Sequence, residues 1–436
     1  MIRLHNLRLP LDYTEEDLKK AAARALGLPL TRIRRAVLSR RAADARKRED
    51  VHFAASIDVE LDKGESVVLK RCSRAELVTP TGYRPPVPAA RPSQPPVVIG
   101  SGPAGLFAAL TLARVGLEPI LLERGRDVDA RQRDVDRFRE TGRLDPESNV
   151  QFGEGGAGTF SDGKLNTGIK DPRCRFVLEQ LAAAGAPESI LWQAKPHVGT
   201  DRLRLAVKGL RKEILRLGGQ VRFGWRVTDL LTENGVLQGL QVMSPEGERD
   251  LACSAAILAI GHSARDTLDM LCAQGLRMEQ KPFAVGVRIE HPRRMIDEAR
   301  YGRFAGHPAL GAADYKLSCR PAGGRGVYTF CMCPGGVVVP AASEPGGLAV
   351  NGMSEYDREA VNSNSALLVG VGPEDYGDPH PLAGVAFQRR LEQAAFRLGG
   401  GGYRAPAQLA GDFLRGRASS ALGEVEPSYR PGTTLC

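Results

Sequence analysis

The chain has 436 residues, which is enough for two or three domains with separate hydrophobic cores. Apolar residues make up 42% and charged residues 25%, the balance of an ordinary soluble globular protein. The eight cysteines lack the spacing of a disulfide framework, and the start lacks an apolar signal region. Both features predict reduced thiols in the cytoplasm. The most apolar long stretch, 97–125, carries Arg114, Glu118 and several glycines, so no membrane span is predicted. The net charge of +9 predicts either a solvated basic surface or attraction to nucleic acid, anionic membrane or an anionic cofactor.

Residues 1–78 predict a small α+β domain of the ferredoxin-like kind. Thr14 and the acids after it resemble a capping box at a helix start, and Gly27 is a suitable helix stop. Strands are predicted over 1–8, 34–41 and 51–61. Residues 79–96 hold seven prolines and no apolar periodicity, which predicts an extended linker.

A glycine turn follows this linker, in the sequence GSGPAG at 100–105. It comes after the apolar strand 97–99, opens a helix over 104–115 and precedes a second apolar strand over 119–122. This strand–turn–helix–strand context is the one in which G-x-G-x-x-G binds a dinucleotide. The alternative is a glycine-rich surface turn.

Each position of the motif has its own expected role. Gly100 allows the tight turn, Gly102 lets the backbone approach a pyrophosphate, and Gly105 lets the helix pack closely on the strand. The helix N-terminus then presents free N–H groups to the phosphates. Glu123, at the end of the second strand, is expected to accept hydrogen bonds from ribose hydroxyls.

The region 200–265 predicts a helix followed by strands. Apolar residues at helical spacing predict the helix over 201–217. Strands are predicted over 220–231, 236–243 and 255–260. Asn234-Gly235 is a hairpin turn signal between the first two strands. The pattern predicts a three-stranded meander and then a buried strand that ends at Gly261.

These motifs resemble the glutathione-reductase-type flavoprotein superfamily, which binds FAD at such a turn. The resemblance lies in Pro103-Ala104 inside the turn, in Glu123-Arg124-Gly125 after the second strand, and in ILAIGHSA at the end of the region just described. It implies that Val227 lies against the adenine. It also implies that the turn at 259–263, with Ala259, Gly261 and His262, lies near the cofactor.

The loop GEGGAGTFSDGKLNT at 153–167 is expected to face the flavin. Its glycines expose backbone N–H groups that can wrap a phosphate or an electron-rich ring. Lys164 is expected near the N1–C2=O edge, where its charge stabilises the anionic reduced ring. A flexible glycine loop is the alternative. The cofactor contacts predicted here are Gly153, Gly155, Gly156, Ser161, Asp162, Gly163 and Lys164.

Cys331 and Cys333 lie in the sequence CMCPGG. They are too close together for a structural zinc site without a second ligand pair, and none is present in the sequence, so no metal site is predicted. One interpretation is a catalytic redox pair beside the flavin, although thiol exchange normally favours the C-x-x-C spacing. The other is that buried thiols line a strand over 327–333.

Further segments, among them KPFAVGVRIEH and YTFCMCPGG, resemble a bacterial family of uncharacterised FAD-dependent dehydrogenases, also grouped as NAD(P)/FAD-dependent oxidoreductases. The resemblance covers nearly the whole chain and implies FAD but no substrate. Members of the family close the FAD site with a late segment similar to GEGAGYAGG, which this sequence lacks. We therefore expect the C-terminal FAD-binding segment to be missing or altered.

The fold predicted from these features is a Rossmann-type α/β FAD-binding domain with a three-stranded meander and an inserted α+β substrate domain. The FAD-binding domain is expected over 97–170 and 200–265, and the substrate domain over 171–199 and 266–436. The predicted function is an FAD-dependent oxidoreductase of unknown substrate. No second glycine turn in the strand–turn–helix context of residues 97–115 is recognised, so NAD(P)H is expected only as a transient electron donor.

Two alternatives remain at this point. The first is an RNA- or tRNA-associated flavoprotein that docks through its basic N-terminal domain, without an accompanying set of stacking aromatics. The basic strip comprises Arg32, Arg34, Arg35, Arg40, Arg41, Arg46, Lys47 and Arg48. The second alternative is a non-enzymatic flavin binder or an inactive product.

Overall fold

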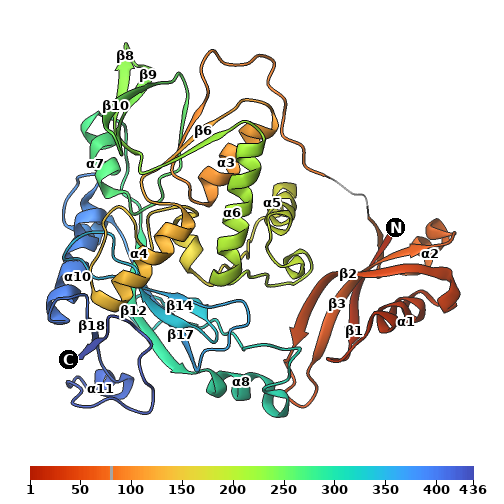
Figure 1. The fold of residues 1–436 in the computed structure, drawn as a ribbon. Helices are drawn as coiled ribbons and strands as arrows, with labels where there is room; N and C mark the ends of the chain where they lie inside the picture. The colour runs from red at the N-terminus through yellow and green to blue at the C-terminus, as the bar shows by residue number, and fades with distance from the viewer. Residues whose placement is uncertain (79–81) are drawn as a thin grey trace.

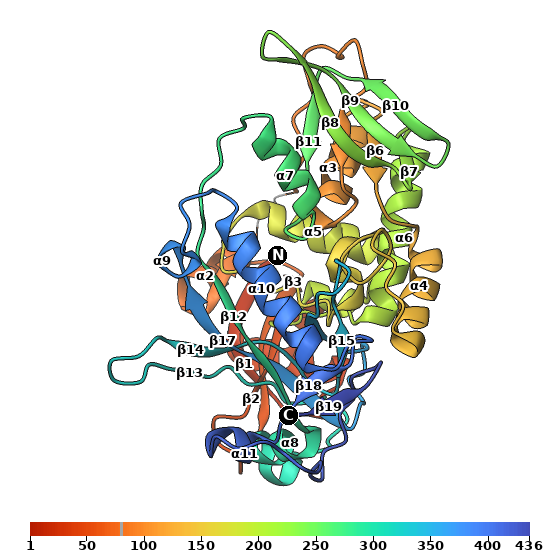
Figure 2. The same cartoon turned by 90° about the vertical axis from the view of Figure 1, so that its left-hand side faces the viewer.

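The computed structural model describes residues 1–78 and 82–436 (Figure 1). The first three residues of the predicted linker, 79–81, lie outside the described residues. Three units are visible: an N-terminal unit, a unit built on a parallel sheet, and a C-terminal unit built on an antiparallel sheet. The parallel-sheet unit lies above the antiparallel sheet in both views (Figures 1 and 2). No helix among the described residues is both long enough and apolar enough to span a bilayer.

The N-terminal unit is a four-stranded antiparallel sheet with two helices, in the sheet order β2-β3-β1-β4. This order is that of the ferredoxin-like βαββαβ arrangement. The predicted helix start is confirmed, because Thr14 and Asp17 form a capping box. The last helix and strand were not predicted, because both are short. The elements are β1 (Ile2–Leu9), α1 (Glu15–Leu26), β2 (Ile33–Asp44), β3 (His52–Leu61), α2 (Glu65–Arg71) and β4 (Ala75–Leu77).

The second unit has a four-stranded parallel sheet in the order β11-β5-β6-β7. Val98 of β5 packs against α3 and α6, whereas Val97 and Ile99 pack against the antiparallel meander β8-β9-β10. Burial on both faces is why the strand sequences are continuously apolar. The elements are β5 (Val97–Ile99), α3 (Pro103–Arg114), β6 (Ile120–Glu123), α4 (Val128–Thr141), α5 (Pro172–Ala183), α6 (Thr200–Arg216), β7 (Gln220–Phe223), β8 (Arg226–Glu233), β9 (Val236–Ser244), β10 (Gly247–Ala252) and β11 (Ala256–Leu258).

Two strand predictions in this unit are corrected. The expected strand over 220–231 is two strands, because the chain turns at Gly224, where φ is +72°. Its first half, β7, joins the parallel sheet and its second half, β8, starts the meander. The expected buried strand at 255–260 is shorter and lies at the sheet edge, so Ile257 and Leu258 are 41% and 43% exposed.

The segment 171–199 packs in the core of the parallel-sheet unit, which differs from its predicted place in a substrate domain. Leu181 of α5 and Ile190 are buried in the same cluster as Leu210 of α6. A Cβ on Gly209 would lie 2.1 Å from the backbone oxygen of Ala184, which shows how closely α6 approaches the end of α5. The sequence analysis assigned no element to α5, and local periodicity does not determine which sheet a helix covers.

The C-terminal unit has a four-stranded antiparallel sheet in the order β12-β17-β14-β13. The sequence predicts a helix over 382–398, and the structure confirms it as α10. Tyr301 and Ala313 from the segment around α8 complete the core of the N-terminal unit. The remaining elements are α7 (Arg265–Ala273), β12 (Phe283–Pro292), α8 (Arg293–Tyr301), β13 (Ser318–Cys319), β14 (Val327–Cys333), β15 (Val337–Pro340), β16 (Val350–Met353), β17 (Asn362–Val371), α9 (Pro373–Tyr376), α10 (Ala383–Leu398), β18 (Ala405–Ala407), α11 (Ala410–Leu414) and β19 (Thr433–Leu435).

Candidate functional site

The glycine turn joins β5 to α3, and its three glycines have different neighbours. A Cβ on Gly100, where φ is +99°, would lie 2.5 Å from the backbone oxygen of Ala259. A Cβ on Gly105 would lie 1.8 Å from the backbone oxygen of Gly100. A Cβ on Gly102 would meet only the Cα of Gly156, at 3.9 Å. Internal packing therefore requires glycine at 100 and 105, whereas position 102 faces open space.

This open space is a hollow of about 460 Å³ at the N-terminus of α3. The first turn of a helix leaves N–H groups without intrahelical acceptors, and the helix dipole makes this end electropositive. Pro103 occupies the first helical position, where a missing N–H costs nothing. The predicted residues that line the hollow are Gly100, Gly102, Pro103, Ala104, Glu123, Arg124, Gly153, Gly156, Val227, Ala259, Gly261 and His262.

The remaining predicted cofactor residues do not line the hollow. Gly105 packs α3 on its own turn, and Gly155 is enclosed between Thr159 and Val207. Gly155 also donates its backbone N–H to the backbone oxygen of Ser101 at 2.9 Å, which ties the 153–167 loop to the glycine turn. The others lie further along that loop: Ser161, Asp162, Gly163 and Lys164.

Glu123 is 5% exposed and its carboxylate accepts four hydrogen bonds from the protein. One oxygen accepts the backbone N–H and the hydroxyl of Ser101, at 2.9 and 2.7 Å. The other accepts the backbone N–H groups of Gly125 and Gly153, at 2.8 and 3.0 Å. These bonds use the four acceptor positions of a carboxylate. Glu123 therefore joins the glycine turn to the 153–167 loop, and its contact with a ribose hydroxyl stays a prediction.

Arg124 is likewise engaged by the protein. Its guanidinium pairs with Glu147 at 2.9 Å and with Asp266, in the first turn of α7, at 2.8 Å. It also lies over the ring of Phe152, 4.2 Å from the centroid. These contacts hold α7 and the segment before Gly153 against the end of β6, so Arg124 shapes the wall of the hollow.

Arg131, on α4, was not predicted. It binds the backbone of the segment 149–154, at the start of the 153–167 loop. Its side chain is fully buried and donates to the backbone oxygens of Asn149, Val150 and Glu154, at 2.8, 2.9 and 2.7 Å. Burial lowers the pKa of Arg131 to about 10, so it is charged at neutral pH. An arginine inside an otherwise amphipathic helix pattern carried no signal for this role.

Trp225 also lines the hollow and was not predicted. It follows β7 and precedes Val227, and the Arg222 guanidinium lies 4.7 Å from its ring centroid. Trp225 therefore adds an aromatic side chain to the lining beside Val227, the residue that the resemblance places against the adenine. A usable signal existed, because Trp225 is one of only two tryptophans in the chain.

Asp162 and Lys164 form part of a second cluster, at the antiparallel sheet. Lys164 Nζ lies 3.1 Å from Asp162 and donates to the backbone oxygen of Met332. Arg358 donates to Asp162 at 3.0 Å through Nε. Burial alone would raise the pKa of Asp162, but Arg358 and Lys164 hold it below its usual range. Burial and Arg358 lower the pKa of the nearby His197, which bonds the backbone oxygen of Tyr356 at 2.9 Å.

Cys331 and Cys333 lie in this second cluster, at the end of β14. Cys333 is fully buried, whereas Cys331 is half-buried and has φ of +45°. Arg288 Nη2, from β12, lies 2.7 Å from the backbone oxygen of Cys331 and 3.5 Å from Cys333 Sγ. No group of three or more metal-ligating side chains occurs among the described residues.

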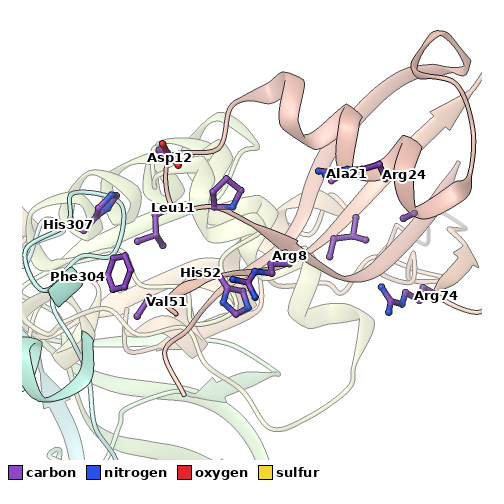
Figure 3. A pocket seen from close by; sticks show the side chains of 13 residues that line it. Arg8, Leu11, Asp12, Ala21, Arg24, Val51, His52, Arg74, Phe304 and His307 are labelled. Carbon is purple, nitrogen blue, oxygen red and sulfur yellow. The ribbon is translucent and has the colours of Figure 1, made fainter. Parts of the chain in front are cut away.

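A larger hollow, of about 780 Å³, lies between the N-terminal unit and the segment after α8 (Figure 3). Leu11, Val51 and Phe304 form an apolar end of it in the view shown. Its basic lining residues are Arg8, Arg24, His52, Arg74 and His307.

The predicted basic strip of the N-terminal unit is partly engaged within the protein. Arg32 pairs with Asp62 at 2.6 Å, and Arg46 pairs with Asp44 at 2.6 Å. Arg41 lies 4.6 Å from the Trp192 ring centroid and joins the N-terminal unit to the segment after α5. The strip is therefore not one free surface.

Residues 282–436 match the family model described as "FAD-dependent protein, C-terminal domain-like", and residues 1–60 match a domain of unknown function, DUF8436. The first match extends to residue 436, so the expected loss of a C-terminal FAD-binding segment finds no support.

Two solved structures similar to this chain are flavoproteins. The myxobacterial chondrochloren halogenase CndH, described as an FAD-dependent halogenase, is 16% identical with a TM-score of 0.34, over 70% of this chain and 57% of that one. The glycerol-3-phosphate dehydrogenase of Bacillus halodurans, complexed with FAD, is 12% identical with a TM-score of 0.30, over 64% of this chain and 47% of that one. This chain thus spans about half the length of each.

An "Uncharacterized protein" of Clostridium beijerinckii is 48% identical over 437 residues, which is 99% of this chain and 81% of that protein. The chain belongs to the same family as this clostridial protein, and its residues 282–436 are similar to the C-terminal domain of FAD-dependent proteins.

Proposed function

We propose that the protein binds FAD with the pyrophosphate in the hollow at the glycine turn, and acts as an FAD-dependent oxidoreductase. The observation that carries the proposal is the backbone-only wall at Gly102 and Gly156. A Cβ on Gly156 would lie 2.9 Å from the Cα of Gly102, so two bare backbones face each other at a helix N-terminus. Such a surface suits a phosphate, which needs N–H donors and close approach.

The other walls fit the rest of a dinucleotide. Trp225 and Val227 offer an apolar surface to a purine, and Glu123 and Arg124 hold the surrounding segments in place. FAD supplies the redox chemistry when it is bound. The chain binds and orients the cofactor and shields it from water. NAD(P)H is proposed as a transient electron donor, and the description of the C-terminal domain as FAD-dependent supports the choice of cofactor.

The test is the visible absorption spectrum of the purified protein, followed by heat release and identification of the flavin. The variant Gly102→Ala separates cofactor binding from folding, because its methyl group meets no protein atom closer than 3.9 Å and projects into the hollow. We expect it to weaken FAD binding by at least about tenfold, or 1.4 kcal/mol.

The matched control is Gly370→Ala in β17, where a Cβ would likewise meet nothing within 4 Å. It should bind FAD like the original protein. A protein that is colourless and fails to take up added FAD, with unchanged secondary structure, would contradict the proposal. FAD binding without oxidation of NADPH by any acceptor would favour the non-enzymatic alternative.

Docking of RNA through the N-terminal unit is a second candidate. The hollow in Figure 3 favours it, because three arginines from different elements, Arg8, Arg24 and Arg74, line one space. Phosphate contacts of this kind would give steeply salt-dependent binding.

A further inference from the structure

The strand β14 bulges at its cysteines. Phe330 pairs with Ala366 and Cys333 with Asn364, so three steps along β14 match two steps along β17. The extra residue disrupts the ladder and redirects the side chains around it. Cys331, within the bulge, has φ of +45°, a left-handed conformation that is costly for a residue with a Cβ and is typical of functional sites.

Positive charge reaches this bulge from two other elements. Arg288, from β12, donates to the backbone oxygen of Cys331 at 2.7 Å and lies 3.5 Å from Cys333 Sγ. Lys164, from the 153–167 loop, donates to the backbone oxygen of Met332. Asp162 is the acid of the cluster, and Arg358 and Lys164 neutralise it.

An unsatisfied donor lies in the same place. Asn364 is fully buried; its Oδ1 accepts Arg288 Nε at 2.6 Å, and its Nδ2 has no partner. Room for this arrangement depends on Gly352, where a Cβ would lie 2.1 Å from Arg288 Nη2 and 2.3 Å from Asn364 Oδ1. A buried donor without an acceptor is rare, and this one belongs to the residue that pairs with Cys333 across the sheet.

We propose that Cys331 is a nucleophilic thiol whose substrates are disulfides, and that Lys164 and Arg288 stabilise its thiolate while Cys333 remains a thiol. In the step, Cys331 Sγ attacks one sulfur of a disulfide R–S–S–R. A new S–S bond forms between Cys331 and R, the original S–S bond breaks, and R–S⁻ leaves with the electron pair. The disulfide is the oxidant, so no further reactant is needed. The proposal does not depend on FAD.

Electrostatics agree with this geometry. The hydrogen bond from the Cys333 thiol and the charges of Lys164 and Arg288 lower the pKa of Cys331 to about 6, against burial and Asp162. The same hydrogen bond and burial raise the pKa of Cys333. The geometry selects the same residue, because Cys333 Sγ lies 3.3 Å from the backbone oxygen of Cys331 as its donor and is fully buried, whereas Cys331 is half-buried.

The experiment is reaction of the full chain with 5,5′-dithiobis(2-nitrobenzoate) between pH 5 and 9, with each modified cysteine identified by peptide mass spectrometry. The exposed Cys319 is the internal reference. We expect the rate at Cys331 to level off above about pH 7, and to exceed the rate at Cys319 about tenfold at pH 6, since thiolate fraction outweighs the lower nucleophilicity of a less basic thiolate.

Two variants test the cause. Lys164→Met should move the midpoint of the Cys331 profile upward, and Lys164→Arg should restore it; loss of packing alone would not move a midpoint. Cys331→Ser should remove the fast phase. A Cys331 profile that rises only near pH 8.5, as for an ordinary thiol, or a Cys331 that reacts more slowly than Cys319 at pH 6, would overturn the proposal. The outcome is the same with or without added FAD.

Discussion

The hollow at the glycine turn is formed mainly by backbone groups, whereas the cysteine cluster is formed mainly by side chains. Backbone makes the first: a helix N-terminus, the bare glycines 102 and 156, and a carboxylate whose hydrogen bonds join two loops. Side chains make the second, and they come from the 153–167 loop, β12, β14 and β17. The glycine turn and Glu123 of the first site lie within residues 100–123, whereas every part of the second site comes from a different segment of the chain.

The difference has a consequence for mutation. A site made of backbone is damaged by adding atoms, since glycine leaves nothing to remove. A site made of charged side chains is damaged by removing one partner, because the remaining charges are then buried without compensation. The predictions below test this contrast, from the largest expected effect to the smallest.

The largest effect is expected for Gly105→Ala. Its Cβ would lie 1.8 Å from the backbone oxygen of Gly100, so the turn or the helix must move. We expect the free energy of unfolding to fall by about 3 kcal/mol or more. Urea denaturation followed by circular dichroism measures this. Gly102→Ala is the matched control, and its free energy of unfolding should stay within about 1 kcal/mol of the original protein. Equal losses for the two variants would show that the two glycines do not have different structural roles.

The next effect is expected for Glu123→Gln. The amide group would place a donor against backbone N–H groups that now donate to the carboxylate. We expect a loss of about 2 kcal/mol in the free energy of unfolding, the range for hydrogen bonds to a charged group. Faster hydrogen exchange at Gly125 and Gly153 should accompany it. The exposed Glu118, changed to Gln, should have almost no effect. Unchanged stability of Glu123→Gln would contradict the positioning role.

A smaller effect comes from His197, at the cysteine cluster. Its pKa is lowered by burial and by Arg358, so the folded protein binds its proton less readily than the unfolded chain does. The resulting stability is present at pH values above the histidine pKa in the unfolded chain, about 6.5. It is lost as the pH falls below that pKa. We expect a fall of about 1 kcal/mol between pH 7.5 and 5.5.

The variant His197→Asn should lose part of this pH dependence. The pH dependence that remains in the variant should come from His291, because burial also lowers its pKa. Urea midpoints at the two pH values measure both contributions. A pH dependence that is identical in the variant would show that His197 titrates alike in both states.

The last expected effect is on RNA binding rather than on stability, at the basic hollow of Figure 3. The double variant Arg24→Gln and Arg74→Gln should weaken single-stranded RNA binding by about tenfold at 50 mM salt and flatten its salt dependence by about two charges. Fluorescence anisotropy with a labelled oligonucleotide measures this. Arg46→Gln, which removes an arginine already paired with Asp44, should change binding far less. No binding by the original protein at low salt would remove the RNA candidate.

Sequence patterns succeeded where one segment determines its own structure. The Thr14 capping box, the strand–turn–helix at 97–115 and the helix before Gly399 follow from local periodicity and cap residues. Sequence patterns failed where tertiary packing determines which sheet a segment joins or covers. Gly224 splits one apolar run between two sheets, and α5 joins the core of the parallel-sheet unit because α6 approaches it closely at Gly209.

The sequence by itself determined the glycine turn, because its conformation is local: φ is +99° at Gly100, and a Cβ on Gly105 would lie 1.8 Å from the backbone oxygen of Gly100. It also identified Cys331 and Cys333 as notable. Only the tertiary structure decided which charges reach them, since Lys164 and Arg288 lie 167 and 43 positions before Cys331 in the chain. Hydrogen bonds between such distant residues form only after the sheets have packed, so no local pattern encodes them.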